Sequence, residues 1–265
     1  MTNIVEIPNS ELSVSKIAMH CDKCITDSKG RSVAAPLMST SHFYIISGAS
    51  GSGKSNLIVN LLKSTKITKD KKHKKSYRNM FENIILVSPS AHTIKDSPLE
   101  NISDDQKFNS ISEDMFDLVD SMTEDAVEDD KHTLLILDDV SSQLRLKENE
   151  KHLNQLVKNR RHINLSIWII GHRVTDLSPA LRSNANLIYL FKPKTTREIE
   201  TIQSEFMMLP KLKADELMKA SYKNRYDFML IDTSLRSGSD FLYYRNFNQL
   251  IFEDDKNEIE NQKNI

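Results

Sequence analysis

Cysteine is scarce in this chain of 265 residues, which contains only Cys21 and Cys24, in a C-x-x-C spacing. A protein zinc site usually combines such a pair with a second pair of ligands at a fitting distance. The sequence has no second cysteine pair, although His20 and His42 lie nearby. We therefore interpret the two cysteines as reduced thiols, with a zinc site as the alternative.

Long apolar runs are absent as well. No run approaches the ~20 residues that a membrane-spanning helix needs, so we expect no membrane insertion. Residues 1–6 lack a basic region followed by an apolar core, so no secretory signal is visible and we expect the protein to act inside a cell. A net charge of −1 with 28% charged residues indicates a soluble surface. The length suits one α/β domain with insertions better than two separate domains.

Glycine is rare too, yet three of the six glycines fall within positions 48 to 55. This stretch fits the G-x-x-x-x-G-K-[ST] phosphate-binding loop, with an apolar strand before it and a helix after it. Glycines let the backbone wrap an anion, and the N–H groups at the helix start face the phosphates. Lys54 would reach the β- and γ-oxygens, and Ser55 would ligate magnesium. The alternative is an ordinary glycine turn. The predicted nucleotide-binding residues are Gly48, Ala49, Ser50, Gly51, Ser52, Gly53, Lys54, Ser55 and Asn56.

A second apolar run, residues 133–137, ends in two carboxylates, Asp138 and Asp139. Buried acids are rare unless they are paired or bound to a metal, and this is the Walker B pattern. Asp138 would hold Mg²⁺, directly or through water, and Asp139 would orient and deprotonate the attacking water. The alternative is that the two acids only cap the segment that follows.

The run 165–170 predicts another buried strand, which ends at Gly171-His172-Arg173. A polar residue at the tip of a core strand can sense phosphate, and His172 occupies that place. A histidine satisfied within a turn is an equally good interpretation.

Other patterns complete the expected organisation. Residues 83–87 predict a buried strand beside the strand at 43–47, and residues 186–191 predict a further core strand. Helices are expected near 148–158, from Pro179 after an N-cap at Ser178, and over 195–207 and 211–220. Residues 226–232 and 241–244 would form a C-terminal hairpin, and a β element is expected within residues 1–42.

Two stretches carry charge of one sign. Residues 63–78 hold seven lysines and one arginine against a single acid, with Lys69 to Lys75 at the centre. We interpret them as a solvated loop, with contact to DNA phosphate as the alternative. From Glu100 to Asp130 twelve acids face one base, Lys107, so duplex DNA is not expected to lie along that surface.

Taken together, GASGSGKS, LLILDD, NRRHINLSIWIIGHR and SPALRSNANLIYLF resemble the virion DNA-packaging ATPases of poxviruses, giant viruses and virophages, a branch of the FtsK/HerA superfamily. The resemblance covers about residues 40 to 192. It implies an α/β fold: a RecA-like P-loop NTPase core with a mainly parallel central sheet flanked by helices, charged insertions and a small C-terminal β element. It also implies ATP and Mg²⁺ as cofactors and a ring of five or six subunits.

The resemblance further implies that ATP drives double-stranded DNA into a preformed capsid. The partners would be that DNA and a capsid vertex or other assembly proteins. The expected location is the viral factory in the host cytoplasm, with the virion as the alternative. A cellular HerA-like or FtsK-like translocase and a small-molecule P-loop kinase are the alternative functions. The expected divisions are an extension at 1–42, the ATPase domain at 43–252 and an acidic, disordered tail at 253–265.

Site residues follow from the resemblance by position. Lys54 and Ser55 correspond to the Walker A lysine and hydroxyl, Asp138 to the metal acid, and Asp139 to the catalytic acid, which is often glutamate in related motors. The family usually has glutamine where this sequence has His172. Ring ATPases commonly add an arginine from a neighbouring subunit, and the candidates are Arg160, Arg161 and Arg182. They flank the strand at 165–170, a region whose ends we expect near the carboxyl edge of the sheet, where the nucleotide binds. We expect Arg161 to act in this way, the alternative being that Arg160 and Arg161 neutralise the carbonyls of the preceding helix.

Overall fold

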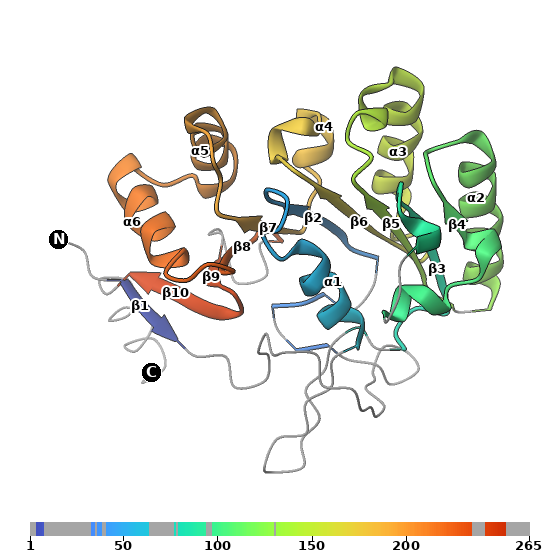
Figure 1. Ribbon diagram of the computed structural model, residues 1–265, viewed down its shortest axis with the longest axis horizontal. Coiled ribbons are helices and arrows are strands. Elements are labelled where there is room, and N and C mark those ends of the chain that lie inside the picture. The colour runs from blue at the N-terminus through green and yellow to red at the C-terminus, as the bar shows by residue number, and fades with distance from the viewer. Residues whose placement is uncertain are drawn as a thin grey trace, which may run out of the picture.

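The computed structural model describes residues 4–7, 33–34, 36–38, 41–63, 77, 79–93, 97–129, 131–234 and 242–252 (Figure 1). Its centre is a ten-stranded sheet in the order β1-β10-β9-β8-β7-β2-β6-β5-β3-β4. The strands are β1 (Ile4–Ile7), β2 (Phe43–Ser47), β3 (Asn83–Val87), β4 (Lys107–Phe108), β5 (Thr133–Asp138), β6 (Leu165–Gly171), β7 (Leu187–Phe191), β8 (Phe228–Asp232), β9 (Leu242–Arg245) and β10 (Asn248–Phe252).

Strand direction divides this sheet into two parts. From β4 through β3, β5, β6 and β2 to β7 every pairing is parallel. From β7 through β8, β9 and β10 to β1 every pairing is antiparallel. The expected mainly parallel α/β core and C-terminal β element are therefore confirmed, and the C-terminal strands extend the central sheet. β1, which lies within the predicted N-terminal extension, pairs with β10 and forms the edge of the sheet.

Helices cover both faces of the sheet. α2 to α6 stand on one side in Figure 1 and α1 on the other. Successive side chains of β2 alternate between two cores, with Phe43 and Ile45 facing the first group of helices and Tyr44 and Ile46 facing α1. Burial on both faces explains why the parallel strands read as continuous apolar runs. The helices are α1 (Lys54–Lys63), α2 (Glu113–Glu128), α3 (Lys147–Asn159), α4 (Pro179–Arg182), α5 (Thr196–Ile202) and α6 (Lys211–Ser221).

Local signals placed these helices well. Ser178 caps α4 by accepting a hydrogen bond from the Leu181 N–H at 3.4 Å, with Pro179 at the first position, as the sequence predicts. The helix expected over 195–207 is α up to Ile202 and continues as a π-helical turn over Gln203–Met207. The left-handed backbone of Met208, at a φ of 48°, then ends it.

One prediction of neighbouring strands was wrong. β3 was expected beside β2, but β5 and β6 lie between them. The reason is that β2 already bonds on both edges, to β6 and to β7. β3 pairs instead with β5 and β4.

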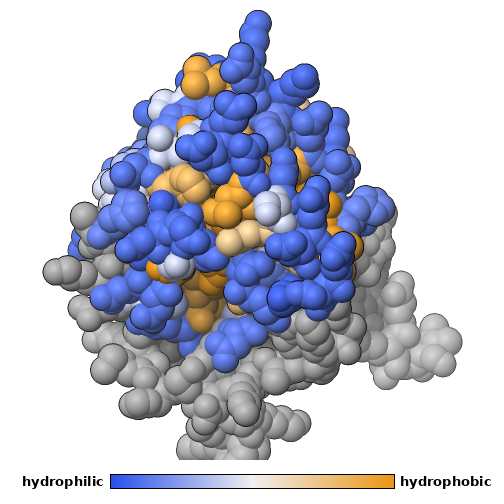
Figure 2. Space-filling view, turned by 90° about the vertical axis from the view of Figure 1, so that its right-hand side faces the viewer, coloured by the Kyte–Doolittle hydropathy of each residue, from blue (hydrophilic) through white to orange (hydrophobic). Residues whose placement is uncertain are grey.

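Helix α2 forms an acidic surface near the end of the sheet that carries β4. All seven of its acidic side chains are exposed, and its sequence holds no basic residue. Figure 2 views the molecule from this end, where hydrophilic side chains predominate. The acids are Glu113, Asp114, Asp117, Asp120, Glu124, Asp125 and Glu128.

Three predictions fall outside the described residues: the pair Cys21 and Cys24, the lysine stretch 69–75 and the tail from residue 253. Among the helices that the structure describes, none combines the length and apolar character required to cross a membrane.

Candidate active site

The loop from Gly48 to Gly53 joins β2 to α1, and its backbone explains its glycines. Gly51 and Gly53 have φ values of 72° and 112°, which side chains rarely allow. A Cβ on Gly48 would lie 2.6 Å from the Phe191 Cβ and 2.8 Å from the Ser52 Oγ. The loop therefore curls tightly against β7 before α1 begins.

Lys54, the first residue of α1, reaches back across this loop. Its Nζ donates hydrogen bonds to the carbonyl oxygens of Gly48 at 2.6 Å and Ala49 at 3.2 Å. Burial lowers the pKa of Lys54, while the charges of Asp138 and Asp139 act in the opposite direction. The amine thus lies between the loop and the two carboxylates, where a bound phosphate would meet it.

Asp138 ends β5 and belongs to the same site. Its Oδ2 accepts a hydrogen bond from the Ser88 hydroxyl, at the end of β3, at 3.5 Å. Burial and the nearby charge of Asp139 raise the pKa of Asp138, while Lys54, Ser88 and His172 lower it. A carboxylate in such a place gains most from a cation beside it.

The oxygen donors at this point fit magnesium. The Asp138 carboxylate and the Ser55 hydroxyl line one cleft, and both are the hard ligands that Mg²⁺ prefers. In the described part of the chain, no three or more His, Cys, Asp or Glu side chains group so that they could hold a metal ion. Mg²⁺ usually takes only one or two protein ligands and completes its shell with water and substrate phosphates, so this sparse set is the expected one.

Asp139 has an unusual backbone and a specific partner. Its φ of 57° is left-handed, and its N–H bonds to the Ile170 carbonyl of β6 at 3.1 Å. Its Oδ1 lies 3.0 Å from the His172 Nε2, and both side chains are about half exposed. His172 thus reaches across from the tip of β6 to the predicted catalytic acid, and its role as a phosphate sensor stays a prediction.

These residues enclose a cleft of about 470 Å³ at the carboxyl ends of β2, β3, β5 and β6. Ligands of open α/β sheets bind at this edge. Of the predicted site residues, all but Gly48, Ala49 and Arg161 line it. The segment from Ser88 to Ser90 was not predicted as part of the site. The Ser-Pro turn directly after a buried strand could have indicated it. The lining residues are Ser50 to Asn56, Ser88 to Ser90, Asp138, Asp139 and Ile170 to His172.

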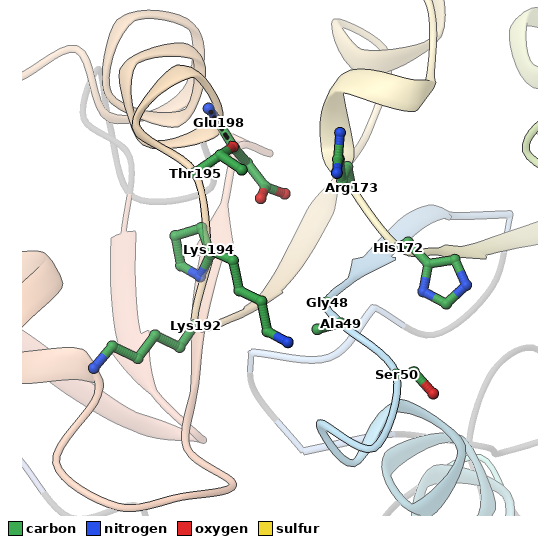
Figure 3. A pocket seen from close by; sticks show the side chains of 10 residues that line it. Gly48, Ala49, Ser50, His172, Arg173, Lys192, Lys194, Thr195 and Glu198 are labelled. Atoms are coloured by element: carbon green, nitrogen blue, oxygen red, sulfur yellow. Dashed lines mark hydrogen bonds between the residues drawn. The ribbon is translucent and has the colours of Figure 1, made fainter.

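A second hollow of about 190 Å³ adjoins the start of the loop (Figure 3). It is lined by Gly48 and Ala49, by Arg173 after β6, and by the segment from Lys192 to Thr195 after β7. In Figure 3 the Lys194 amine points toward Gly48 and Ala49. Sequence reasoning missed this segment, although two lysines directly after a core strand could have indicated it.

Glu198 of α5 completes the second hollow and is only 5% exposed. Its Oε1 accepts a hydrogen bond from the Val174 N–H at 3.3 Å. Burial raises the pKa of Glu198, opposed by backbone hydrogen bonds from Val174 and Lys194 and by the charge of Arg173. The carboxylate ties the start of α5 to the segment that follows β6.

The sequence profile of the poxvirus A32 protein matches residues 34–265, which is most of the chain. This chain belongs to the poxvirus A32 protein family. The resemblance to poxvirus packaging ATPases inferred from the motifs is therefore confirmed.

One individual relative matches part of this A32-family chain at low sequence identity. Uncharacterized protein 015R of frog virus 3 (isolate Goorha) is 29% identical over 102 residues, which are 38% of this chain and 31% of that protein. The match thus spans about a third of the relative's length.

The solved structures that resemble this A32-family chain include the genome packaging NTPase B204 of Sulfolobus turreted icosahedral virus 2. Its complex with ATP-gammaS has a TM-score of 0.50 and 18% identity, covering 78% of this chain and 98% of that one. Its complex with AMPPCP gives the same TM-score and identity, covering 77% and 97%. At this identity the likeness shows a shared fold.

The candidate arginines of this A32-family chain do not reach its own cleft. Arg160 and Arg161 lie in the turn between α3 and β6, at the amino edge of the parallel strands, opposite the cleft. The expectation that this turn lies near the carboxyl edge was wrong, because it precedes β6 and the cleft follows it. Arg161 is exposed.

Arg160 and Arg182 are both engaged in the fold. Arg160 donates to the carbonyl oxygens of Val157 at 2.5 Å and Ser41 at 3.2 Å, and to the Asn186 Oδ1 at 3.1 Å. Its bond to Val157 confirms that it neutralises a carbonyl near the end of α3. Arg182 is also buried and forms a bidentate ion pair with Glu205. Arg161 is therefore the exposed one of the three candidates.

Proposed function

We propose that this chain is a Mg²⁺-dependent ATP hydrolase that moves double-stranded DNA into a viral capsid. The observation that carries the proposal is that two segments far apart in the sequence meet in one cleft: the phosphate-binding loop with Lys54, and the pair Asp138 and Asp139. Membership of the A32 family and the fold shared with a genome packaging NTPase support the choice of DNA as the substrate that is moved.

Each residue has a separate part in hydrolysis. The loop N–H groups and Lys54 bind the β- and γ-phosphates, and Asp139 accepts a proton from the attacking water. Ser55 and Asp138 would hold Mg²⁺, which when bound neutralises charge that develops on the phosphates. His172, 3.0 Å from Asp139, orients that carboxylate.

Duplex DNA would meet a side of the molecule other than the α2 end. Seven exposed acids on α2 would repel the phosphate backbone. The lysines at 69–75, outside the described residues, are interpreted as a solvated loop, and a salt titration tests the alternative that they contact DNA phosphate. Under this alternative the affinity for duplex DNA would depend on salt through these lysines. Neutralising four of them should reduce the slope of log K against log salt by up to about 0.9 for each DNA phosphate that is no longer neutralised.

The active form would be a homo-oligomeric ring of five or six subunits. In a closed ring each subunit uses one surface to contact the neighbour on one side and a different surface to contact the neighbour on the other side. The surface of one subunit that faces away from its own cleft would therefore approach the cleft of its neighbour. Arg161, which is exposed at the amino edge of the parallel strands, opposite the cleft, would serve the γ-phosphate bound by a neighbouring subunit. Such an arginine is worth roughly 10³–10⁵ in rate where it has been identified.

Mixing two inactive variants tests the trans arginine. Arg161→Ala and Lys54→Ala subunits should each be inactive alone, and mixed rings should recover part of the activity because some interfaces combine an intact Lys54 with an intact Arg161. Full activity of Arg161→Ala on its own would exclude this role.

The proposed function as a whole is tested by the ATPase rate with and without duplex DNA, measured alongside the mass by light scattering with and without nucleotide. We expect duplex DNA to stimulate hydrolysis and nucleotide to favour assembly. The proposed place of action is the host cytoplasm. Turnover that does not depend on DNA but requires a small molecule as the acceptor of the phosphoryl group would instead identify a kinase.

A further inference from the structure

An exposed aromatic side chain lies beside the phosphate-binding loop. Tyr226 is 56% exposed, one of the few large hydrophobic side chains that the described fold leaves at its surface. A Cβ on Gly53 would lie 3.6 Å from the Tyr226 Cδ1, so the ring lies next to the last loop residue before Lys54. The Arg225 guanidinium carbon lies 5.1 Å from the centre of this ring, within cation–π distance.

The sheet explains why Tyr226 reaches the loop. β8 runs antiparallel to β7, with Phe228 opposite Phe191, so the chain enters β8 at the edge where β7 ends. That is the carboxyl edge of the parallel strands, which also carries the loop. Tyr226, two residues before Phe228, therefore comes to this edge from a segment about 170 residues after the loop.

The turn that carries Tyr226 is fixed by Asp227. The Asp227 N–H bonds to the Asn224 carbonyl at 3.3 Å, which leaves Arg225 and Tyr226 at the two central positions. The buried Asp227 carboxylate accepts hydrogen bonds from the Asn224 N–H at 2.8 Å, the Arg245 Nε at 2.9 Å and the Asn246 Nδ2 at 3.1 Å. The turn is thus attached to β9 and to the turn between β9 and β10, while its two central side chains face outward.

The direction of a bound nucleotide follows from the strand order. The terminal phosphate would lie beside Asp138, the last residue of β5, and Asp139, which follows it. From there the order is β6, β2, β7 and β8, and the loop follows β2. A nucleotide with its terminal phosphate at the β5 side and its other phosphates on the loop would extend its other end away from β5, past Gly53, toward the start of β8.

We propose that Tyr226, with Arg225 beside it, is the platform on which the base of the bound nucleoside triphosphate stacks. This inference rests on the proposed function, because it names the residues that would contact the base of a nucleotide whose phosphates lie in the cleft. The ring offers a rigid π-face, and Arg225 adds a positive charge beside a polyanionic ligand. Stacking of this kind accepts any base, so the platform contributes affinity to ATP without reading hydrogen-bonding groups on the base.

Comparing ATP with inorganic tripolyphosphate, which has no base, tests the platform in the full chain. The dissociation constants of both ligands are measured by calorimetry with Mg²⁺ for the wild type, Tyr226→Ala and Tyr226→Phe. Base stacking is worth about 1–3 kcal/mol, so Tyr226→Ala should bind ATP about 5- to 140-fold more weakly and tripolyphosphate within twofold of the wild type. Tyr226→Phe keeps the ring and should bind both ligands normally.

The outcomes separate this inference from the proposed function. If Tyr226→Ala binds ATP as tightly as the wild type, or weakens ATP and tripolyphosphate equally, the platform is wrong and the ATPase assignment stands. A wild-type chain that binds neither ligand would overturn both. A thermal melt of each variant shows whether it is folded, and the exposed position of Tyr226 leads us to expect unchanged melting.

Discussion

Replacing Asp139 by asparagine isolates the chemistry of one carboxylate. Asparagine has the same size, and with aspartate it is among the residues that best tolerate the left-handed backbone found here, with a φ of 57°. The bond from the residue 139 N–H to the Ile170 carbonyl involves only the backbone and should persist. An amide oxygen can also accept from the His172 Nε2 that now lies 3.0 Å from the Asp139 Oδ1. What the variant loses is the negative charge and the ability to take a proton.

The expected size of the effect follows from that loss. A positioned general base contributes about 10²–10⁴ in rate, or about 2.7–5.4 kcal/mol of transition-state stabilisation at 1.36 kcal/mol per decade. Single-turnover hydrolysis of bound ATP should slow by this factor. ATP affinity should stay near the wild-type value, because the loop and Lys54 are untouched.

Lys54→Ala is the contrasting variant. The lysine charge meets the phosphates in both the ground and the transition state, so its removal should weaken binding as well as turnover. Equal melting temperatures of the wild type and Asp139→Asn would show that the fold is intact. A kcat within threefold of the wild type in Asp139→Asn would refute the assignment of the base.

Three further changes probe how the site is held in place. Gly48→Ala would bring a Cβ to 2.6 Å from the Phe191 Cβ, so the loop must shift. The free energy of unfolding in urea should fall by about 1–3 kcal/mol, and ATP should bind more weakly. An unchanged unfolding free energy and unchanged ATP affinity would contradict the packing. Arg160→Met removes three hydrogen bonds of a buried guanidinium and should cost about 3 kcal/mol of unfolding free energy, while Arg161→Ala in the same turn should stay within about 0.5 kcal/mol. Burial raises the pKa of Glu198, so its stabilising contribution is fully present below the unfolded pKa of about 4.3 and is lost as the pH rises through the folded pKa. Glu198→Gln, which keeps an acceptor for the Val174 N–H, should therefore melt above the wild type at neutral pH and converge with it in acid; a constant difference would contradict the burial argument.

Sequence alone predicted the parts of the site that are set locally. The phosphate-binding loop is a contiguous stretch whose glycines are required by its own backbone. The pair Asp138 and Asp139 comes at the end of a buried strand, which the apolar run before it shows. The apolar runs also predicted the parallel strands, because burial on both faces leaves a continuous hydrophobic signature.

Features set by distant pairings were not predicted. The order of β2 and β3 depends on which strands occupy the edges of β2, and these come from residues after 160. The edge on which Arg161 lies depends on strand direction, and periodicity does not show that. Tyr226 carries no motif, and its place beside Gly53 arises only because β8 runs antiparallel to β7.

Displacement of the third strand from a DNA triplex tests the central claim, that ATP hydrolysis in this cleft moves the chain along duplex DNA. The assay places a triplex at one end of a long duplex and measures the release of the third strand. We expect release that requires ATP hydrolysis, slows as the duplex between loading site and triplex lengthens, and is absent with Lys54→Ala. Vigorous ATP hydrolysis with no release beyond that of Lys54→Ala would contradict the account.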